Sequence, residues 1–178
     1  MEKEKLLVHV CCAPDALYVL DILKKSYEVI GFFYNPNISP QEEYSLRLSE
    51  TEKVAEILAV ELREGPYDSS DWHRLTRKAR DEPEKGKRCD ICYAIRLKTT
   101  AETAFNSGFD AFTTVMSLSP WKKSDILNKM GRMFSKRYKI TFLEKNFKKR
   151  DGFKKSSEMS KRYGLYRQNY CGCIYSKK

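Results

Sequence analysis

Short apolar runs alternate with amphipathic stretches along the chain, and this alternation constrains the fold more than any other feature. The runs typical of strands cover residues 6–10, 29–34, 60–63, 110–116 and 140–143. Helical periodicity covers residues 14–25, 42–59, 71–80, 89–106 and 153–163, and Ser119 with Pro120 predicts the first residues of one more helix. Regular strand–helix alternation predicts an α/β fold with a parallel, doubly wound sheet.

The length of 178 residues fits one domain, with about 70% of the extended chain's surface available for burial. We therefore expect residues 1–178 to form a single α/β domain on which a basic C-terminal segment, about 121–178, is packed. No apolar run reaches the ~20 residues of a membrane span, and the first residues are unlike a signal peptide. These features predict a cytoplasmic protein with reduced thiols and no membrane partner.

Charge is distributed unevenly along the chain, whose net charge is +10. Residues 121–178 carry 18 basic and 4 acidic side chains, whereas residues 1–120 carry 16 basic and 20 acidic ones. Such asymmetry favours a polyanionic partner, and nucleic acid is the usual one. A highly charged thermophilic surface is the alternative, but such surfaces mix both signs and this segment does not.

Six cysteines occur in three close pairs, which are Cys11–Cys12, Cys89–Cys92 and Cys171–Cys173. Disulfides need an oxidising compartment, and inert buried cysteines would not pair in this way. A zinc site remains open, although only Cys89 and Cys92 have the usual spacing. An iron–sulfur cluster tolerates varied spacing and is favoured, and six thiols exceed the four that one cluster needs.

The placement of the cysteines predicts their environment. Cys11 and Cys12 follow the first strand, at the sheet edge where α/β proteins bind ligands. Cys89 and Cys92 lie at the start of a helix, where the helix dipole with Lys87 and Arg88 is expected to lower the thiol pKa.

The sequence gives little support for histidine-based catalysis or for nucleotide binding. His9 alternates with apolar residues and is expected in the core, while His73 is expected at the surface. The chain has no glycine-rich phosphate loop, and the loop after the first strand contains no glycine. ATP-driven chemistry and nicotinamide binding are therefore disfavoured.

A joint pattern of motifs resembles the epoxyqueuosine reductase family QueH across residues 6–176. It comprises Cys11-Cys-Ala-Pro, the segment 34–47 with Glu43, Tyr44 and Arg47, Arg88-Cys-x-x-Cys-Tyr-x-x-Arg-Leu97, the segment 108–114, Ser119-Pro120 and Tyr166-Arg-Gln-x-Tyr-Cys-Gly-Cys173. The resemblance implies a HUP-like, PP-loop-related fold and a reductase that deoxygenates epoxyqueuosine at the wobble position of tRNA. It also implies an external electron donor.

The resemblance assigns roles to the cysteines. Cys11, Cys12, Cys89 and Cys92 match the ligands of a [4Fe–4S] cluster, and Cys171 with Cys173 matches a redox-active catalytic pair, which either cycles through a disulfide or holds a metal. Asp15 stands where many members have a third cysteine after Cys-Cys-Ala-Pro. Asp15 either helps Cys171 and Cys173 hold an additional mononuclear iron, delivers a proton, or is an ordinary residue of a first helical turn.

Substrate contacts are expected from two groups of side chains. Tyr34, Asn35, Tyr166, Arg167 and Tyr170 suit a flipped nucleoside and the anticodon loop. Turn chemistry explains Asn35 equally well, and packing that anchors the cysteine loop is the alternative for the last three. Lys148, Lys149 and Arg150 are expected to meet phosphates. Two alternatives remain, namely a PP-loop-type iron–sulfur tRNA thiolase and a zinc-stabilised RNA-binding module.

Overall fold

The computed structural model describes residues 2–177, which form a five-stranded parallel sheet in the order β3-β2-β1-β4-β5. The strands are β1 (Lys5–Val10), β2 (Glu28–Phe33), β3 (Glu61–Glu64), β4 (Ala111–Thr114) and β5 (Thr141–Phe142). The predicted α/β class with a parallel sheet is confirmed.

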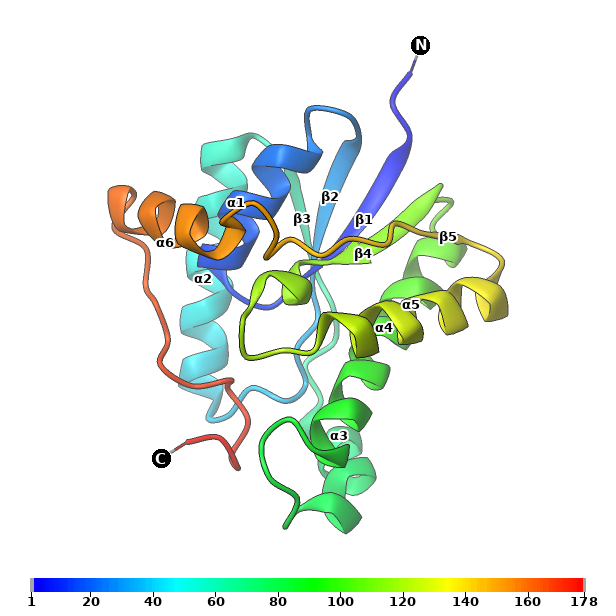
Figure 1. Ribbon diagram of the computed structural model, residues 1–178, viewed down its shortest axis with the longest axis vertical. Coiled ribbons are helices and arrows are strands. Elements are labelled where there is room, and N and C mark those ends of the chain that lie inside the picture. Colours follow the sequence, from blue (N-terminus) through cyan, green and yellow to red (C-terminus); the bar gives the residue numbers. More distant parts are fainter. Residues whose placement is uncertain (1, 178) are drawn as a thin grey trace.

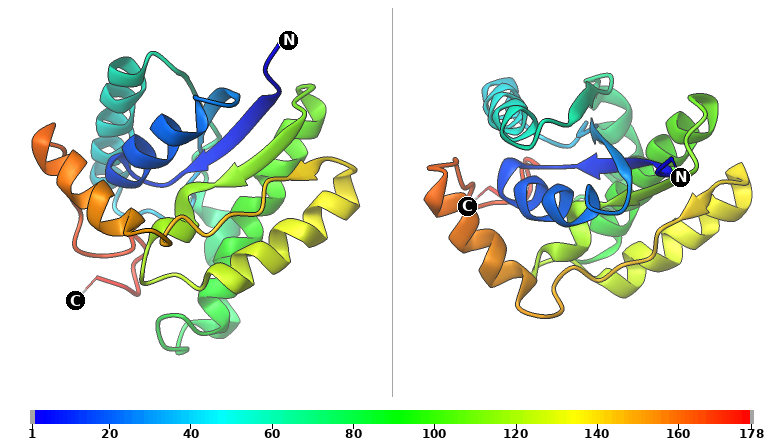
Figure 2. Two further views of the ribbon diagram at one scale, coloured as in Figure 1. Left: turned by 45° about the horizontal axis from the view of Figure 1, so that its top comes forward. Right: turned by 90° about the horizontal axis from the view of Figure 1, so that it is seen from above.

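Helices connect these strands in both directions from the centre of the sheet. They are α1 (Ala13–Leu23), α2 (Gln41–Leu58), α3 (Ser69–Thr76), α4 (Lys87–Asn106), α5 (Ser124–Tyr138) and α6 (Gly152–Arg162), with short 3-10 helices η1 (Arg77–Ala79) and η2 (Val115–Leu118). Right-handed crossovers place α1 and α2 on one face of the sheet and α4 and α5 on the other. The packing agrees, because α1 contacts α2 and α6 while α4 contacts α5 (Figures 1 and 2).

The core is densest around β1, the central strand. Leu6, Leu7 and Val8 are fully buried because helices cover both faces of the sheet. His9 lies among them, and its Nδ1 and Nε2 are each 3.0 Å from an oxygen, the Thr114 hydroxyl and the Tyr34 carbonyl. Burial lowers the His9 pKa to about 3, so the ring is neutral and links the ends of three strands, as expected for a core histidine.

The prediction that a helix begins at Ser119 and Pro120 was wrong. The Thr114 hydroxyl accepts a hydrogen bond from the Met116 N–H, which ends β4 and starts η2 instead of continuing the strand to residue 116. The Lys122 N–H then donates to the Ser119 carbonyl and closes a single turn. The chain extends again at Lys123, so α5 begins only at Ser124.

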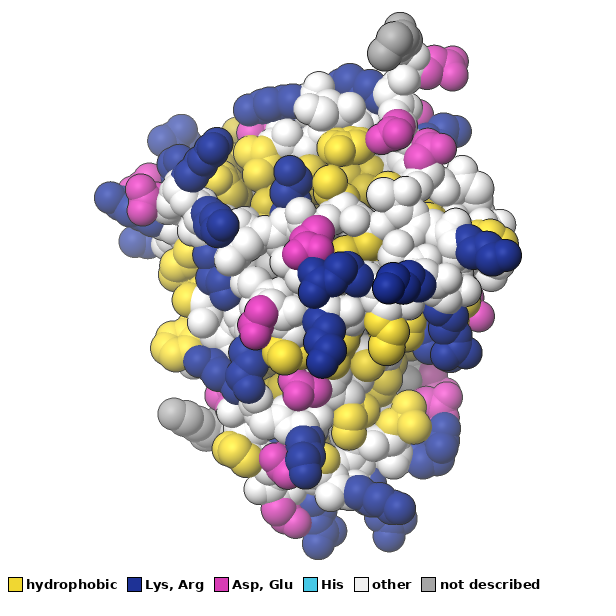
Figure 3. Space-filling model, turned by 45° about the vertical axis from the view of Figure 1, so that its right-hand side comes forward, with side chains coloured by type: hydrophobic (Ala, Val, Ile, Leu, Met, Phe, Trp, Pro, Cys, Tyr) yellow, Lys and Arg dark blue, Asp and Glu magenta, His cyan; other side chains and the backbone are white. Residues whose placement is uncertain are grey.

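The surface is rich in positive charge. On the face drawn in Figure 3, Lys and Arg side chains are widely spread and interleave with hydrophobic ones. None of the helices within residues 2–177 combines the length and apolar character needed to cross a membrane.

Candidate metal centre

The cysteines gather where the order of the sheet reverses. β1 pairs with β2 on one side and β4 on the other, and the crevice beyond the carboxyl ends of such strands is the usual ligand site of this fold. Cys11 follows β1 directly, and Cys12 is the N-cap residue of α1. The predicted position of this pair at the sheet edge is confirmed.

Cys11, Cys12 and Asp15 form a first, compact group. One ligand atom from each side chain lies within 4.8 Å of the others, and all three residues are buried. A hydrogen bond between the two thiols lowers the pKa of Cys11 and raises that of Cys12. Burial, with the nearby Cys11 charge, raises the pKa of Asp15 to about 7. Two thiols and a carboxyl group in this arrangement suit a metal ion.

Two cations lie beside the sulfur-rich region. Burial works against the charged form of Lys122, but the charges of Cys11, Cys171 and Asp15 raise its pKa overall. Arg96 behaves in the same way, and its pKa is raised by the charges of Cys92, Cys171 and Cys11. The pKa of each cation is raised by cysteines from segments that are distant in the sequence. The cysteine pairs therefore share one electrostatic environment.

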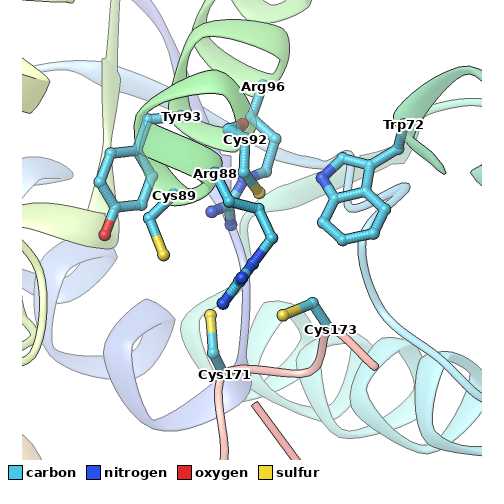
Figure 4. Close-up of a pocket in the computed structure, with 8 residues that line it drawn as sticks. All are labelled: Trp72, Arg88, Cys89, Cys92, Tyr93, Arg96, Cys171 and Cys173. Atoms are coloured by element: carbon cyan, nitrogen blue, oxygen red, sulfur yellow. The ribbon is translucent and has the colours of Figure 1, made fainter. Parts of the chain in front are cut away.

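Four cysteines from two segments line a single pocket. Cys89 and Cys92 lie one helical turn apart at the start of α4, so their side chains share a face. Cys171 and Cys173 come from the irregular C-terminal segment and face them across the pocket (Figure 4). All six cysteines are free thiols. The structure therefore groups Cys171 and Cys173 with the α4 pair, and groups Asp15 with Cys11 and Cys12.

The expected low pKa at the start of α4 was wrong. Burial raises the pKa of Cys89, and it raises that of Cys92 to about 11. Removal of the thiols from water outweighs the helix dipole and the neighbouring cations. These sulfurs are therefore thiols in the metal-free chain, and a metal would have to displace their protons.

The pocket also contains buried donors that lack acceptors. Nε of Arg88, Nη2 of Arg96 and Nε1 of Trp72 are buried without a hydrogen-bond partner, and all three residues line the pocket. Unsatisfied buried donors are costly, so three around one pocket point to an acceptor-rich, negatively charged occupant.

Residues 163–177 form an irregular segment, here called the C-terminal strap, which α2 holds in place. Arg47 of α2 is 2% exposed, and its Nη1 and Nη2 donate to the carbonyls of Cys171 and Tyr170 at 3.0 and 3.1 Å. Its Nε donates to Glu43 at 2.6 Å. One buried guanidinium therefore fixes the backbone at Tyr170 and Cys171, beside Cys173.

Further contacts hold the strap at both ends. The Ser39 N–H donates to the Gly172 carbonyl at 2.8 Å, and the Tyr166 N–H donates to Glu50 Oε2 at 2.8 Å. The hydroxyls of Tyr166 and Tyr170 donate to Glu43 and to the Ser39 carbonyl. The structure thus uses both tyrosine hydroxyls to anchor the strap, which is the packing alternative for these residues.

The remaining predicted substrate residues lie around the same edge. Asn35 is buried, donates from Nδ2 to the Val10 carbonyl at 2.9 Å and leaves Oδ1 without a partner, while Tyr34 stacks on Phe32. Arg167 is exposed and donates to Ser160 Oγ. Lys148 is half-buried, and Lys149 and Arg150 are exposed.

Sequence reasoning gave Arg88 only an effect on the thiol pKa at the start of α4, and it assigned no role to several other residues that shape this site. Arg47, Arg88 and Arg96 occur in the motifs quoted above, but their spacing does not reveal that they face cysteines or the strap. The available signal for Arg96 was its position four residues after Cys92 in the predicted helix, which places both side chains on one helical face. No signal in the sequence pointed to Trp72 or Lys122.

Comparison with known proteins gives a consistent result. Residues 6–178 match the family model described as Epoxyqueuosine reductase QueH. The chain is 38% identical to the epoxyqueuosine reductase QueH of Streptococcus pyogenes serotype M1, over 99% of this chain and 71% of that protein. It is 36% identical to that of Thermotoga maritima, over 96% of this chain and 89% of that protein.

Solved structures share the fold at low identity. A predicted subunit of a tRNA methyltransferase from Methanocaldococcus jannaschii matches with a TM-score of 0.61 at 16% identity, covering 88% of this chain and 76% of that one. The U34-tRNA thiolase NcsA from Methanococcus maripaludis, solved with its [4Fe–4S] cluster, matches with a TM-score of 0.60 at 16% identity, covering 99% of this chain and 61% of that one. These likenesses support the predicted fold class.

Proposed function

The chain belongs to the epoxyqueuosine reductase family QueH, and from this premise we propose that it deoxygenates epoxyqueuosine at the wobble position of tRNA through an iron–sulfur site built from its cysteine pairs. The observation that carries the proposal is the convergence of Cys89, Cys92, Cys171 and Cys173 on one pocket at the ligand edge of the sheet.

The reaction sets clear requirements for the site. Both carbon–oxygen bonds of the epoxide break, a carbon–carbon double bond forms, and the oxygen leaves as water after taking up two electrons and two protons. No side chain of the chain is a renewable source of electrons, so an external donor must supply them. The protein must hold the redox group, bind the nucleoside beside it and place positive charge near the departing oxygen.

The pocket fits a [4Fe–4S] cluster. Four thiolates are the usual ligand set, and the cluster with its thiolates carries net negative charge and accepts N–H hydrogen bonds at sulfur. The unpartnered donors of Arg88, Arg96 and Trp72 suit such an occupant. We propose Cys89, Cys92, Cys171 and Cys173 as the ligands, in place of the set implied by resemblance, which included Cys11 and Cys12. Bound there, the cluster would supply electrons one at a time.

Cys11, Cys12 and Asp15 are proposed to hold a second metal ion, an iron that would act as a Lewis acid towards the epoxide oxygen. The support is their mutual proximity of 4.8 Å or less and their mixed thiol and carboxyl chemistry. The sequence analysis predicted that Asp15 would hold this iron together with Cys171 and Cys173. We propose Cys11 and Cys12 as its partners instead. Lys122 contributes a positive charge beside this group.

Metal and sulfide analysis after anaerobic purification tests the proposal. We expect iron and acid-labile sulfide, a brown colour and no stoichiometric zinc. We also expect the purified protein to convert epoxyqueuosine in tRNA to queuosine with a chemical reductant and without ATP. Zinc without sulfide would instead establish the zinc-stabilised RNA-binding module, and a requirement for ATP would favour the thiolase.

Serine variants separate the two ligand assignments. If the pocket holds the cluster, Cys171→Ser and Cys173→Ser lose sulfide and the visible absorption, whereas Cys11→Ser keeps both and loses only the additional iron. If the resemblance-based set is correct, Cys11→Ser loses the cluster, and the strap variants retain it while losing turnover. Asp15→Asn is the matched test of the second metal. We expect this variant to contain as much sulfide as the unsubstituted protein but less iron per chain.

Transfer RNA is the proposed partner because the family name specifies a tRNA nucleoside and the C-terminal third is strongly basic. Exposed Lys149 and Arg150, with Arg167, are proposed to contact phosphates without reading sequence. The unpartnered Oδ1 of Asn35 is proposed to accept a hydrogen bond from the bound nucleoside. The protein is proposed to act in the cytoplasm, where its tRNA substrate is found.

A further inference from the structure

The turn between η2 and α5 sends two neighbouring side chains in different directions. The Trp121 N–H donates to Ser119 Oγ at 3.3 Å, and the Lys122 N–H donates to the Ser119 carbonyl at 3.2 Å. Lys122 lies close enough to Cys11, Cys171 and Asp15 for their charges to raise its pKa. Trp121 is 67% exposed and therefore lies on the outside of the same turn.

One lysine lies over this indole, and another contacts the backbone of the same turn. Lys85 Nζ lies 5.2 Å from the centroid of the Trp121 ring, and the Lys85 N–H donates to Cys89 Sγ at 3.3 Å. Lys148 Nζ donates to the Lys122 carbonyl at 2.7 Å. Burial lowers the pKa of Lys148, nearby Asp125 opposes the shift, and the positive charges of Lys122 and Lys85 add to it.

An exposed tryptophan flanked by lysines has the chemistry of a base-stacking platform. Nucleobases stack on aromatic side chains whatever their identity, while lysines meet the flanking phosphates. A protein partner would be expected to cover a wider apolar surface, whereas the Lys85 ammonium lies over the Trp121 ring and Lys148 contacts the same turn. The connection to Cys89 through Lys85 places this platform at the rim of the sulfur site.

We infer that Trp121 stacks on a nucleobase adjacent to the modified nucleotide, and that Lys85 contacts a phosphate beside it. This inference rests on the proposed function, because it takes the anticodon loop of tRNA as the ligand. Trp121 would fix the position of the loop so that the neighbouring nucleoside reaches the crevice.

Binding of a dye-labelled anticodon stem–loop RNA to the anaerobically purified protein tests the inference. We expect Trp121→Ala to weaken binding about 5- to 100-fold and Trp121→Phe to retain most of the affinity, because a smaller aromatic ring still stacks. Phe105→Ala is the matched control, since Phe105 is 54% exposed at the far end of α4 from Cys89. Iron and sulfide content must equal those of the unsubstituted protein in each variant.

The salt dependence separates stacking from charge. Trp121→Ala should leave the slope of log affinity against log salt unchanged, while Lys85→Gln should make it shallower by about 0.7. If the unsubstituted protein binds the RNA and Trp121→Ala binds it equally well, the inference fails and the proposed function stands. If the unsubstituted protein does not bind the RNA at all, both fail.

Discussion

Gly172 occupies a restrictive backbone position beside the cysteine pocket. Its φ of +113° is one that residues with a Cβ atom rarely adopt. A Cβ there would lie 3.0 Å from both Arg47 Nη1 and Ile38 Cγ1. Glycine therefore lets Cys171 and Cys173 turn toward the pocket while the guanidinium of Arg47 lies against the backbone between them.

We expect Gly172→Ala to reduce cluster content strongly, because the strap must shift to relieve both the strained φ and the close contacts. Gly164→Ala is the control, since Gly164 also has a positive φ, +62°, but a Cβ there meets nothing within 4 Å. Iron and sulfide per chain are the measurement. Equal cluster content in the two variants would show that the geometry at Gly172 does not control the pocket.

At the scale of elements, α2 serves the site without contributing a ligand. Glu43, Arg47 and Glu50 are buried at positions three or four residues apart, so they share one face of the helix. This face receives the strap through the carbonyls of Tyr170 and Cys171 and the N–H of Tyr166. These hydrogen bonds to the strap explain why the polar face of α2 that carries Glu43, Arg47 and Glu50 is buried.

Arg47→Met is expected to destabilise the protein by about 3 kcal/mol and to lower cluster content, because it leaves Glu43 buried and unpaired. Arg47→Lys keeps the charge but cannot make the same bidentate contact, so we expect a smaller loss of stability with a clear loss of cluster. Arg63→Met, which removes an exposed ion pair, is the control and should cost less than about 1 kcal/mol. Urea unfolding and sulfide analysis provide the measurements. Full cluster content in Arg47→Lys would contradict the positioning role.

Glu50 makes the attachment of the strap sensitive to acid. Hydrogen bonds from Lys53 and from the Tyr166 N–H lower the Glu50 pKa below its ordinary value of 4.5. A carboxyl group whose pKa is lower in the folded state stabilises the fold above pH 4.5, and this contribution is lost as the pH falls through the folded-state pKa. We expect the difference in free energy of unfolding between the unsubstituted protein and Glu50→Gln, both metal-free, to become smaller as the pH falls from about 5 to about 3. A constant difference would show that Glu50 does not contribute in this way.

At the scale of the whole molecule, the sheet order brings four distant segments to one edge. The ends of β1 and β4, the start of α4 and the strap all meet at the reversal of the strand order. The basic C-terminal third supplies the strap, and it also carries the exposed lysines and arginines proposed to meet RNA. The strap that lines the cysteine pocket and the basic side chains proposed to meet RNA thus belong to the same part of the chain.

The affinity for anticodon stem–loop RNA is expected to fall steeply with added salt. If about four phosphates are neutralised, the slope of log affinity against log salt should be roughly −3 for single-stranded contacts. Replacing Lys149 and Arg150 together by Gln should reduce the magnitude of the slope by about 1.4. Titrations over a range of KCl concentrations measure both quantities, and a slope near zero would exclude phosphate contacts as the main source of affinity.

The sequence by itself determined the parallel α/β architecture, the place of Cys11 and Cys12 beyond the first strand and the core position of His9. These follow from periodicity and from parallel-strand geometry, which are local properties or general rules. Only the tertiary structure decided that Cys171 and Cys173 face Cys89 and Cys92, that Asp15 stays with Cys11 and Cys12, and that burial outweighs the helix dipole at the α4 thiols. Proximity between residues more than 70 positions apart, and the desolvation that comes with it, depend on how whole elements pack, which no local pattern specifies.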